Sequence, residues 1–580
     1  MTHWGDFSRA LFVWTAFLVV THAVATFALD KAGRYALWDE RALEQHRIDY
    51  SWELDLILMA EDGEWSAVDF QYPRGPLFQL LAWLPTAARP GAAHPPPGEP
   101  GDVGWMLLGA EALVQLVCLA LALGIAFCAV RGRWRRLAVA IALGSLAFGA
   151  GIETLRALMS ALVVLTYGAL ELRWRRHPWR GAFLVAGLVA LAGMLSFERW
   201  ALCWIALLVM HGVELFGRLR RGAALRPAWR RLDRVAAAQT LICLALAIAL
   251  HALGGSSWDS LSGSFRTGVS YASTRSIPWL SHGVSPVWVG AFLAAALAIA
   301  VGWVAGAPRR RRYAQWIFGA SAFSVFALFR PYPGQIFLGL APAAVVLAVI
   351  AGRTVRLDRL ASRAGWRLVR AGGHGRVLGV PAGGALCAAL LVASAVAWFG
   401  AYPETLWWRP TNLRRGVAML EGELERDSDH VTEIGQAARW LLSNAPDDAC
   451  FGVYPGATAL YALTGGDGPT RGRMRWTDGG PEALAASIRS ADCPHHVQVL
   501  YSFDRGPAAG MAFGEDFLAV SELYRPRARV GPSTYVLERR EEPAPAQARP
   551  LPLRSERRTH TLRVGERLHV GFDGEVAGHE

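Results

Sequence analysis

Apolar stretches that recur along the first 400 residues constrain the fold of this chain more than any other feature. Many of them approach the ~17 to 25 residues that a helix needs to cross a hydrocarbon core of roughly 30 Å. The composition agrees, because 53% of the residues are hydrophobic, only 18% are charged and the mean hydropathy is +0.25. We therefore predict a mainly α protein, a polytopic transmembrane helix bundle with a soluble portion attached.

We expect about eleven spans in residues 1–400. They cover approximately Phe7–Leu29, Trp105–Val130, Leu137–Ala150, Ala157–Leu172, Ala182–Phe197, Trp200–Phe216, Val235–Leu253, Val287–Ala307, Ala314–Phe329, Gln335–Ile350 and Val377–Phe399. The first could instead be a signal peptide cleaved near Ala23-Val24-Ala25. Its length and its single preceding cation, Arg9, favour an uncleaved anchor.

Arginine sets the predicted orientation, since Lys31 is the only lysine. Basic clusters fall on alternate connections between the spans, and the positive-inside rule places such connections in the cytoplasm. The clusters are Arg131–Arg136, Arg173–Arg180, Arg218–Arg234, Arg309–Arg312 and Arg353–Arg376. We expect a multi-pass protein of the cytoplasmic (inner) membrane whose C-terminal domain is periplasmic or extracellular.

A long acidic loop follows the first span, over residues 30–104, and lies on the side away from the basic clusters. It contains 13 Asp and Glu against 6 Lys and Arg, although the whole chain has a net charge of +12. Connections of this length are uncommon unless they fold into something functional. Within the loop, Pro76–Pro85 is too short to span and is predicted to be a helix on the membrane surface, or a re-entrant segment.

The chain changes character at residue 401, where charges of both signs become interspersed. The pattern predicts a small α/β domain over 401–540, followed by a linker and tail over 541–580. Its expected helices are Val431–Ser443 and Pro481–Arg489, and its expected strands are Cys450–Tyr454, His496–Tyr501 and Thr534–Arg539. Cys450 and Cys493 lie in this domain and form a candidate disulfide, because an oxidising compartment would permit one.

Arginines on the predicted outer connections are the first candidate site residues, because the orientation rule alone makes arginine sparse there. The guanidinium group suits a phosphate oxyanion. We expect a substrate-binding set on these connections that comprises Glu153, Arg156, Glu198, Arg199 and Arg330. The alternative for each arginine is to reach the lipid headgroups or to pair with a neighbouring glutamate.

The acidic loop supplies the candidate catalytic groups, although any single acid there could simply be solvated. Asp49 precedes an apolar run, Leu54–Ala60, that would hold it at the membrane surface and raise its pKa toward a value useful to a general base. Asp39, beside Trp38, and Glu40 are the next candidates. Other loop residues expected to contact substrate are Asp55, Asp69 and Arg74.

Three sets of loop residues resemble those of the GT-C superfamily of membrane glycosyltransferases, which includes the aminoarabinose and protein mannosyl transferases. They are Asp49-Tyr50-Ser51-Trp52, Gly63-Glu64-Trp65 with Asp69-Phe70, and Tyr72–Leu77. A segment of the C-terminal domain, Leu460–Gly465 followed by Pro469-Thr470-Arg471, is also similar to one found in bacterial members. The acids of this chain are more dispersed than in some members, and Arg74-Gly75-Pro76 stands where others have two prolines.

The resemblance implies an inverting transfer of a sugar from a polyprenyl phosphate to a glycan, lipid or protein acceptor outside the membrane. Arginines or a divalent cation would stabilise the departing phosphate. No phosphate-cradling glycine loop, paired CxxC motif or nucleic-acid-binding feature accompanies these residues. A transporter or flippase of lipid-linked sugars and a cell-envelope assembly factor are the alternatives. A transporter would place ionisable residues mid-span, whereas here they gather at the predicted outer ends.

Overall fold

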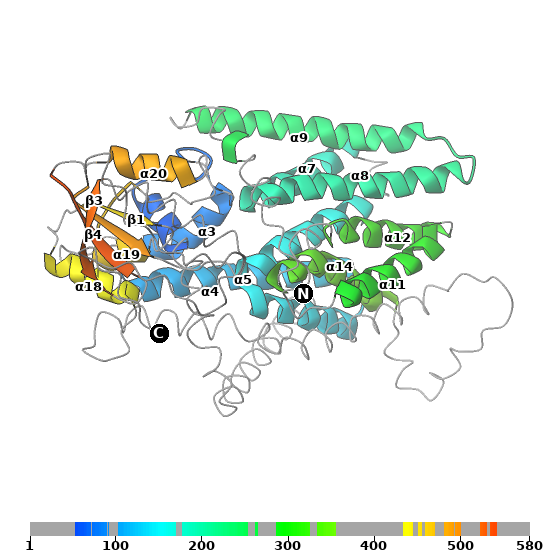
Figure 1. Cartoon of the computed structure of the whole chain (residues 1–580). Helices are drawn as coiled ribbons and strands as arrows, with labels where there is room; N and C mark the ends of the chain where they lie inside the picture. Colours follow the sequence, from blue (N-terminus) through cyan, green and yellow to red (C-terminus); the bar gives the residue numbers. More distant parts are fainter. Residues whose placement is uncertain are drawn as a thin grey trace, which may run out of the picture. The chain divides into compact units, whose positions relative to one another are not determined.

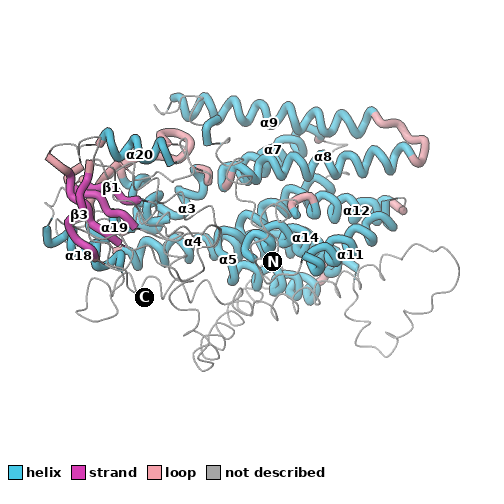
Figure 2. Tube along the Cα trace, viewed as in Figure 1, coloured by secondary structure: helices cyan, strands magenta, loops and turns pink. Residues whose placement is uncertain are grey.

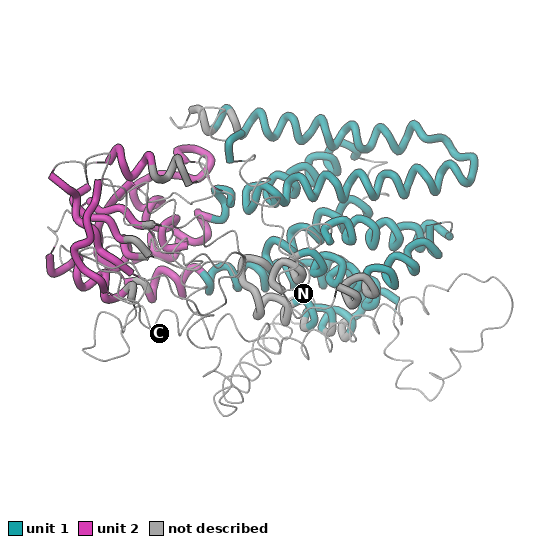
Figure 3. Tube along the Cα trace, in the orientation of Figure 1, with its two compact units in different colours: residues 1–32, 73–78, 111–411 teal, residues 33–72, 79–110, 412–580 magenta. Residues whose placement is uncertain are grey.

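The computed structural model describes only part of the chain. The described residues are 53–70, 72, 74–89, 91, 102–169, 177–252, 262–264, 286–304, 306–324, 333–354, 433–444, 450–454, 459–469, 481–491, 493–499, 523–530 and 534–541. The chain divides into two compact units (Figure 3). Residues 1–32, 73–78 and 111–411 form what we call the helical unit, and residues 33–72, 79–110 and 412–580 form the mixed unit.

Helices make up the described part of the helical unit (Figure 1). They are most of α4 (Val103–Ala129), α5 (Arg133–Ala169), α7 (Pro178–Leu195), α8 (Phe197–Leu219), α9 (Arg226–Ala252), α11 (Pro286–Val304), α12 (Pro308–Ser321) and α14 (Pro333–Thr354). Three described stretches are long and apolar enough to cross a membrane, namely Gly104–Ala129, Pro178–Leu195 and Phe197–Leu219. The helical unit is therefore that of a membrane protein.

Most predicted spans overlap a helix, but the count of about eleven is not confirmed. The helices at Thr154–Ala169, Leu293–Val304 and Gly339–Thr354 are apolar but shorter than a full span. The predicted first and last spans, Phe7–Leu29 and Val377–Phe399, lie outside the described residues.

Two predicted spans, Leu137–Ala150 and Ala157–Leu172, fall in the single helical segment α5. A straight helix of 37 residues would be about 55 Å long. However, a Cβ at Gly352 would lie 2.5 Å from Val139, near the start of α5, and a Cβ at Gly168, near its end, would lie 2.3 Å from Trp316. Arg353 is stacked on Trp316, 4.9 Å from the ring centre. Because both ends of α5 reach this one neighbourhood, the segment is not a straight rod.

The mixed unit is built on a four-stranded sheet with the order β1-β2-β4-β3 (Figure 2). The strands are β1 (Phe451–Tyr454), β2 (His495–Val499), β3 (Tyr524–Arg529) and β4 (Thr534–Arg539), and only β1 and β2 pair in parallel. Between them in the chain lie α19 (Ala459–Thr464) and α20 (Pro481–Ser490), as a parallel connection requires. The unit also contains α18 (Glu433–Asn444).

The strand β3 is absent from the sequence prediction for a physical reason. Its residues, Tyr524–Arg529, include Pro526 and three arginines, a composition poor in strand-forming side chains. The structure places it at an edge of the sheet, where proline and exposed charge are tolerated. The register also shifts at Pro526, where a bulge interrupts the pairing with β4.

The acidic loop contributes to the same hydrophobic core as the C-terminal domain. A helix at residues 53–61 and α3 (Pro76–Ala87) supply its loop side, with Leu54, Ile57, Leu58 and Ala82. On the C-terminal side, the cluster contains buried residues of α18, α19 and three strands, among them Leu441, Phe451, Leu460, Val497 and Val536. The loop segments and the C-terminal segments are about 350 residues apart in the chain. They share one core because together they bury apolar surface.

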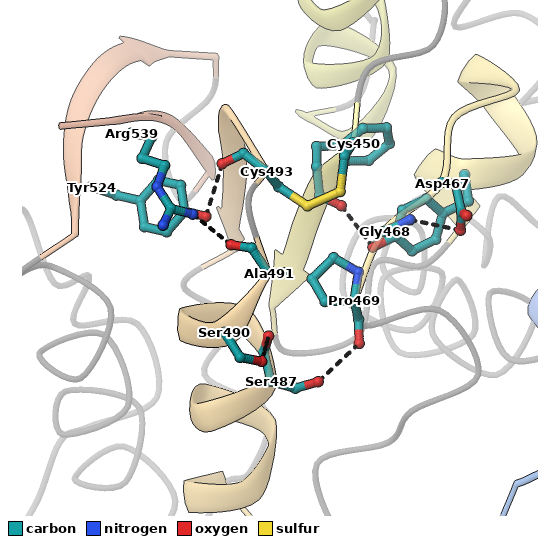
Figure 4. The surroundings of a disulfide bond; sticks show 12 residues. Cys450, Asp467, Gly468, Pro469, Ser487, Ser490, Ala491, Cys493, Tyr524 and Arg539 are labelled. Atoms are coloured by element: carbon teal, nitrogen blue, oxygen red, sulfur yellow. Dashed lines mark hydrogen bonds between the residues drawn. A yellow bond between two sulfur atoms is a disulfide. The ribbon is translucent and has the colours of Figure 1, made fainter. Parts of the chain in front are cut away.

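A disulfide joins Cys450 and Cys493, the two cysteines named above as a candidate pair, with their Cα atoms 4.8 Å apart (Figure 4). Cys450 directly precedes β1, and Cys493 lies two residues before β2. Nearby, the Tyr524 hydroxyl donates to the carbonyl of Cys493 at 3.1 Å, and the Phe451 amide donates to the carbonyl of Asp467 at 3.0 Å. The bond therefore fastens the starts of the two parallel strands to each other.

Candidate functional site

The turn between α7 and α8 carries the strongest group of buried charges among the predicted outer connections. Ser196 is the one residue between the two helices, and its extended backbone (φ −167°, ψ 123°) lets the chain reverse between them. As the N-cap of α8, its hydroxyl would ordinarily accept from a backbone amide of the first turn. Here it makes no such cap bond and is engaged with charged side chains instead.

Arg156 and Glu198 hold that hydroxyl between them. Arg156 Nη2 donates to Ser196 Oγ at 2.6 Å, and Ser196 Oγ donates to a carboxylate oxygen of Glu198. Arg156 and Glu198 also form an ion pair, and the two residues are only 7% and 6% exposed. Because both charged residues are buried, the triad is part of the packed interior and not a surface contact.

The sequence predicted Arg156, Glu198 and Arg199 as one set, and the structure brings them together. Arg156 lies 42 positions before its partner Glu198, and the side chain of the nearby Glu153 is outside the described set. Arg199, in the first turn of α8, is fully buried. An arginine at the N-terminus of a helix opposes the helix dipole, which favours anions there. Its burial at that position concentrates positive charge.

The loop reaches this turn through Gly75. Its amide donates to the carbonyl of Leu195 at 3.3 Å, and its α-carbon faces the last residues of α7. A Cβ at position 75 would lie 2.2 Å from the carbonyl oxygen of Met194, which no side chain can accept. The close approach thus explains why the residue at position 75 is a glycine.

Gly75 also begins a second helix at the same place. α3 starts at Pro76, a residue suited to the first helical position, and the amide of Phe78 donates to the carbonyl of Gly75 at 3.0 Å. Arg74 precedes it, with its guanidinium stacked 4.5 Å from the ring centre of Phe78. The residues that resemble the family motif therefore bring one more cation and one more helix N-terminus to the α7–α8 turn.

The electrostatic balance of this group, which we call the arginine site, is positive. Counted over the side chains that the structure describes and that are named above, its cations are Arg74, Arg156 and Arg199 and its anion is Glu198, a formal sum of 3 − 1 = +2. The N-termini of α3 and α8 add partial positive charge of roughly half a unit each. Such an arrangement favours an anion with one or two negative charges, such as a phosphate ester.

Two of the predicted loop acids belong to the mixed unit, and the candidate bases lie outside the described residues. Asp55 is buried on the helix at residues 53–61 in the mixed unit. Asp69 is exposed and accepts a hydrogen bond from the amide of Trp65 at 2.7 Å, which closes its own turn. The candidate bases and one candidate arginine fall outside the described residues; they are Asp49, Asp39, Glu40 and Arg330.

Gln79 holds the loop together and was not singled out from the sequence. Its side chain is fully buried, donates to the carbonyls of Leu56 (3.0 Å) and Glu64 (2.9 Å), and accepts from the amide of Ser66 (2.7 Å). The sequence feature that could have identified Gln79 is that it is the one amide side chain inside the apolar run Pro76–Pro85. Buried amides of this kind specify loop geometry, because each bond must be satisfied.

No group of three or more His, Cys, Asp or Glu side chains suited to a metal ion occurs in the part of the chain that the structure describes. Since the candidate loop acids lie outside that part, the divalent cation suggested by the resemblance stays a prediction. The described anion-binding groups are arginines and helix N-termini, which need no metal to hold a phosphate.

No family model and no curated protein matches the chain. Solved structures do match, and one of them is similar along most of the length of this chain. It is the archaeal oligosaccharyltransferase AglB from Archaeoglobus fulgidus, in complex with an inhibitory peptide and a dolichol-phosphate. The TM-score is 0.43 at 10% identity, and the match covers 87% of this chain and 71% of AglB.

Proposed function

We propose that the protein is a membrane glycosyltransferase that moves a sugar from a polyprenyl-phosphate donor to an acceptor hydroxyl with inversion. The observation that carries the proposal is the arginine site, where three arginines and two helix N-termini gather beside one glutamate. A membrane protein that concentrates net positive charge in this way favours an anionic group of its substrate. The lipid-linked phosphate is such a group.

The reaction proposed here needs few groups. The acceptor oxygen attacks the anomeric carbon, the bond from that carbon to the phosphate oxygen breaks, and the phosphate leaves with the electron pair. A phosphate departs without a proton, so the site needs positive charge for the leaving group and one base for the acceptor proton. Arg199, Arg156 and Arg74 would supply the charge, and Asp49, with Asp39 and Glu40 behind it, would be the base.

The arginines differ in what they would contribute. Arg156 is already paired with Glu198, so its charge is largely compensated, and its main effect would be to hold the turn. Arg199, fully buried in the first turn of α8, and Arg74, beside the start of α3, are the arginines that would interact most with phosphate. Each charge-assisted hydrogen bond to a phosphate is worth roughly 1.5–3 kcal/mol.

The proposal is tested by following labelled sugar from polyprenyl phosphate in membranes that contain the full chain. We expect Asp49→Asn to lose most transfer, and Arg199→Gln to lower it by about tenfold or more. The proposed base is wrong if Asp49→Asn and Asp39→Asn both transfer at the wild-type rate. If the wild-type protein consumes no lipid-linked donor, the enzymatic function itself is wrong.

A charge-balanced pair of variants separates chemistry from folding at Arg156. Arg156→Gln alone leaves Glu198 buried without its cation, which typically costs 3–5 kcal/mol and would reduce the folded protein. The double variant Arg156→Gln/Glu198→Gln removes both charges and should recover most of that stability. Full transfer by the folded double variant would restrict Arg156 to a structural role.

A further inference from the structure

A second group of arginines lies where α5 and α12 begin and where α14 ends, and none of its members belongs to the arginine site. It comprises Arg309 and Arg310 at the start of α12, Arg353 at the end of α14 and Arg136 at the start of α5. We call these four the basic patch. All belong to the helical unit.

Helix ends hold three of these side chains in place. Arg136 Nε donates to the carbonyl of Val130 at 2.9 Å, and Arg353 Nε donates to the carbonyl of Ala129, at the end of α4. Arg309 Nη2 donates to the carbonyl of Arg353 at 3.2 Å, and its Nε donates to the Tyr313 hydroxyl at 2.9 Å. Cations at helix C-termini are favourable, which explains these bonds.

These bonds engage only some of the N–H groups of each arginine. A guanidinium has five N–H groups, and the contacts above engage one or two on each of Arg136, Arg309 and Arg353. Within the described residues, the partners of these three side chains are carbonyls, a hydroxyl and aromatic rings, and Arg310 has no hydrogen bond or ion pair. The patch therefore gathers four positive charges whose described contacts are all neutral.

The arginines between α8 and α9 provide a contrast inside the same unit. There Glu214 accepts from Arg218 at 2.9 Å and from Arg231 at 3.1 Å, so the chain supplies its own anion. The start of α12 differs, because its first turn has no acidic residue and Ala307 provides no side-chain cap. Arginines in a first turn repel the helix dipole as well as one another, and an external anion would relieve both.

We propose that the basic patch binds the phosphate headgroup of an anionic phospholipid. The occupant follows from position and charge. The side chains of the patch contact the C-terminal ends of the apolar helices Gly104–Ala129 and Gly339–Thr354. At the ends of membrane helices, lipid headgroups are the phosphates at highest local concentration, and an arginine fork matches a phosphodiester. Each arginine near a membrane surface that carries anionic headgroups gains roughly 1 kcal/mol of binding free energy, which is about fivefold in affinity.

The test is a titration of the purified full chain with short-chain phosphatidylglycerol, monitored by the midpoint of thermal unfolding. We expect a saturable rise that phosphatidylcholine does not produce. Arg310→Gln, which breaks no described bond, should weaken the apparent affinity about fivefold. Arg309→Gln/Arg310→Gln should weaken it by about tenfold or more.

The matched control is Arg220→Gln/Arg221→Gln, which removes the same charge from two exposed arginines after α8. It should leave the titration unchanged. Equal weakening in both double variants would overturn the proposal in favour of diffuse attraction by net charge. Saturation by inorganic phosphate alone, at the same concentration, would overturn it in favour of a site for a free anion, and an equal response to phosphatidylcholine would exclude charge recognition altogether.

Discussion

Gly75→Ala tests how the loop is held against the α7–α8 turn. The new Cβ would lie 2.2 Å from the carbonyl oxygen of Met194 and 2.6 Å from its carbonyl carbon, and both are backbone atoms that cannot rotate away. Relief requires that the loop withdraw, which also removes the bond from the Gly75 amide to Leu195. Overpacking costs about 1–3 kcal/mol, and a lost hydrogen bond about 1 kcal/mol.

The docked segment should therefore be destabilised by about 2–4 kcal/mol, which is roughly a 30-fold to 1,000-fold change in its local equilibrium. Hydrogen exchange reports this directly, because the amides of Gly75 and Phe78 are both bonded in the docked state. The control is Gly187→Ala in α7, where a Cβ would meet nothing within 4 Å and alanine favours the helix. Unchanged exchange at Gly75 and Phe78 in the first variant would refute the reasoning.

Three further perturbations address the mixed unit. Gln79→Leu strands the amide of buried Ser66 and should lower the free energy of unfolding by about 2–4 kcal/mol; a thermal midpoint equal to wild type would contradict this. Burial lowers the pKa of His495, and the positive charge of Arg527 lowers it further, against the opposing effect of Glu538. Neutral His495 therefore stabilises the fold at pH values above its ordinary pKa of about 6.5. That stability should be lost as the pH falls from 6.5 through the lower folded pKa, and His495→Gln should flatten the dependence measured by chemical unfolding. Reducing the disulfide, which closes a separation of 43 residues, should cost about 4 kcal/mol in the chain-entropy model, and denaturant midpoints that do not respond to reductant would exclude this.

Residue patterns predicted local structure well for elements whose own sequence shows which face is buried. Strand β4, Thr534–Arg539, and helix α20 follow the predicted bounds to within a residue, because alternation and helical periodicity are local signals. The edge strand β3 gave no such signal, since its arginines face solvent. It is a strand because it pairs with β4 at the edge of the sheet. The short helix α19 was also not predicted, being a single buried turn and a half.

The candidate site was predicted in part. The outer arginines were identified because cations are unexpected on that side of a membrane protein, and Arg156 and Arg199 do lie in one buried group with Glu198. The pairing itself was not predictable, since Arg156 meets a carboxylate 42 positions away in the chain. The base remains a sequence prediction, because Asp49, Asp39 and Glu40 lie outside the described residues.

The sequence by itself determined that this is a membrane protein with an acidic loop and a small α/β domain, because hydropathy and charge act through each segment's own contact with lipid or water. Only the tertiary structure decided that the helix at residues 53–61 shares a core with the C-terminal strands, and that Gly75 sits against Met194 and Leu195. These contacts depend on shape and on partners far away in the chain. Close packing selects them from many arrangements that bury the same apolar residues equally well.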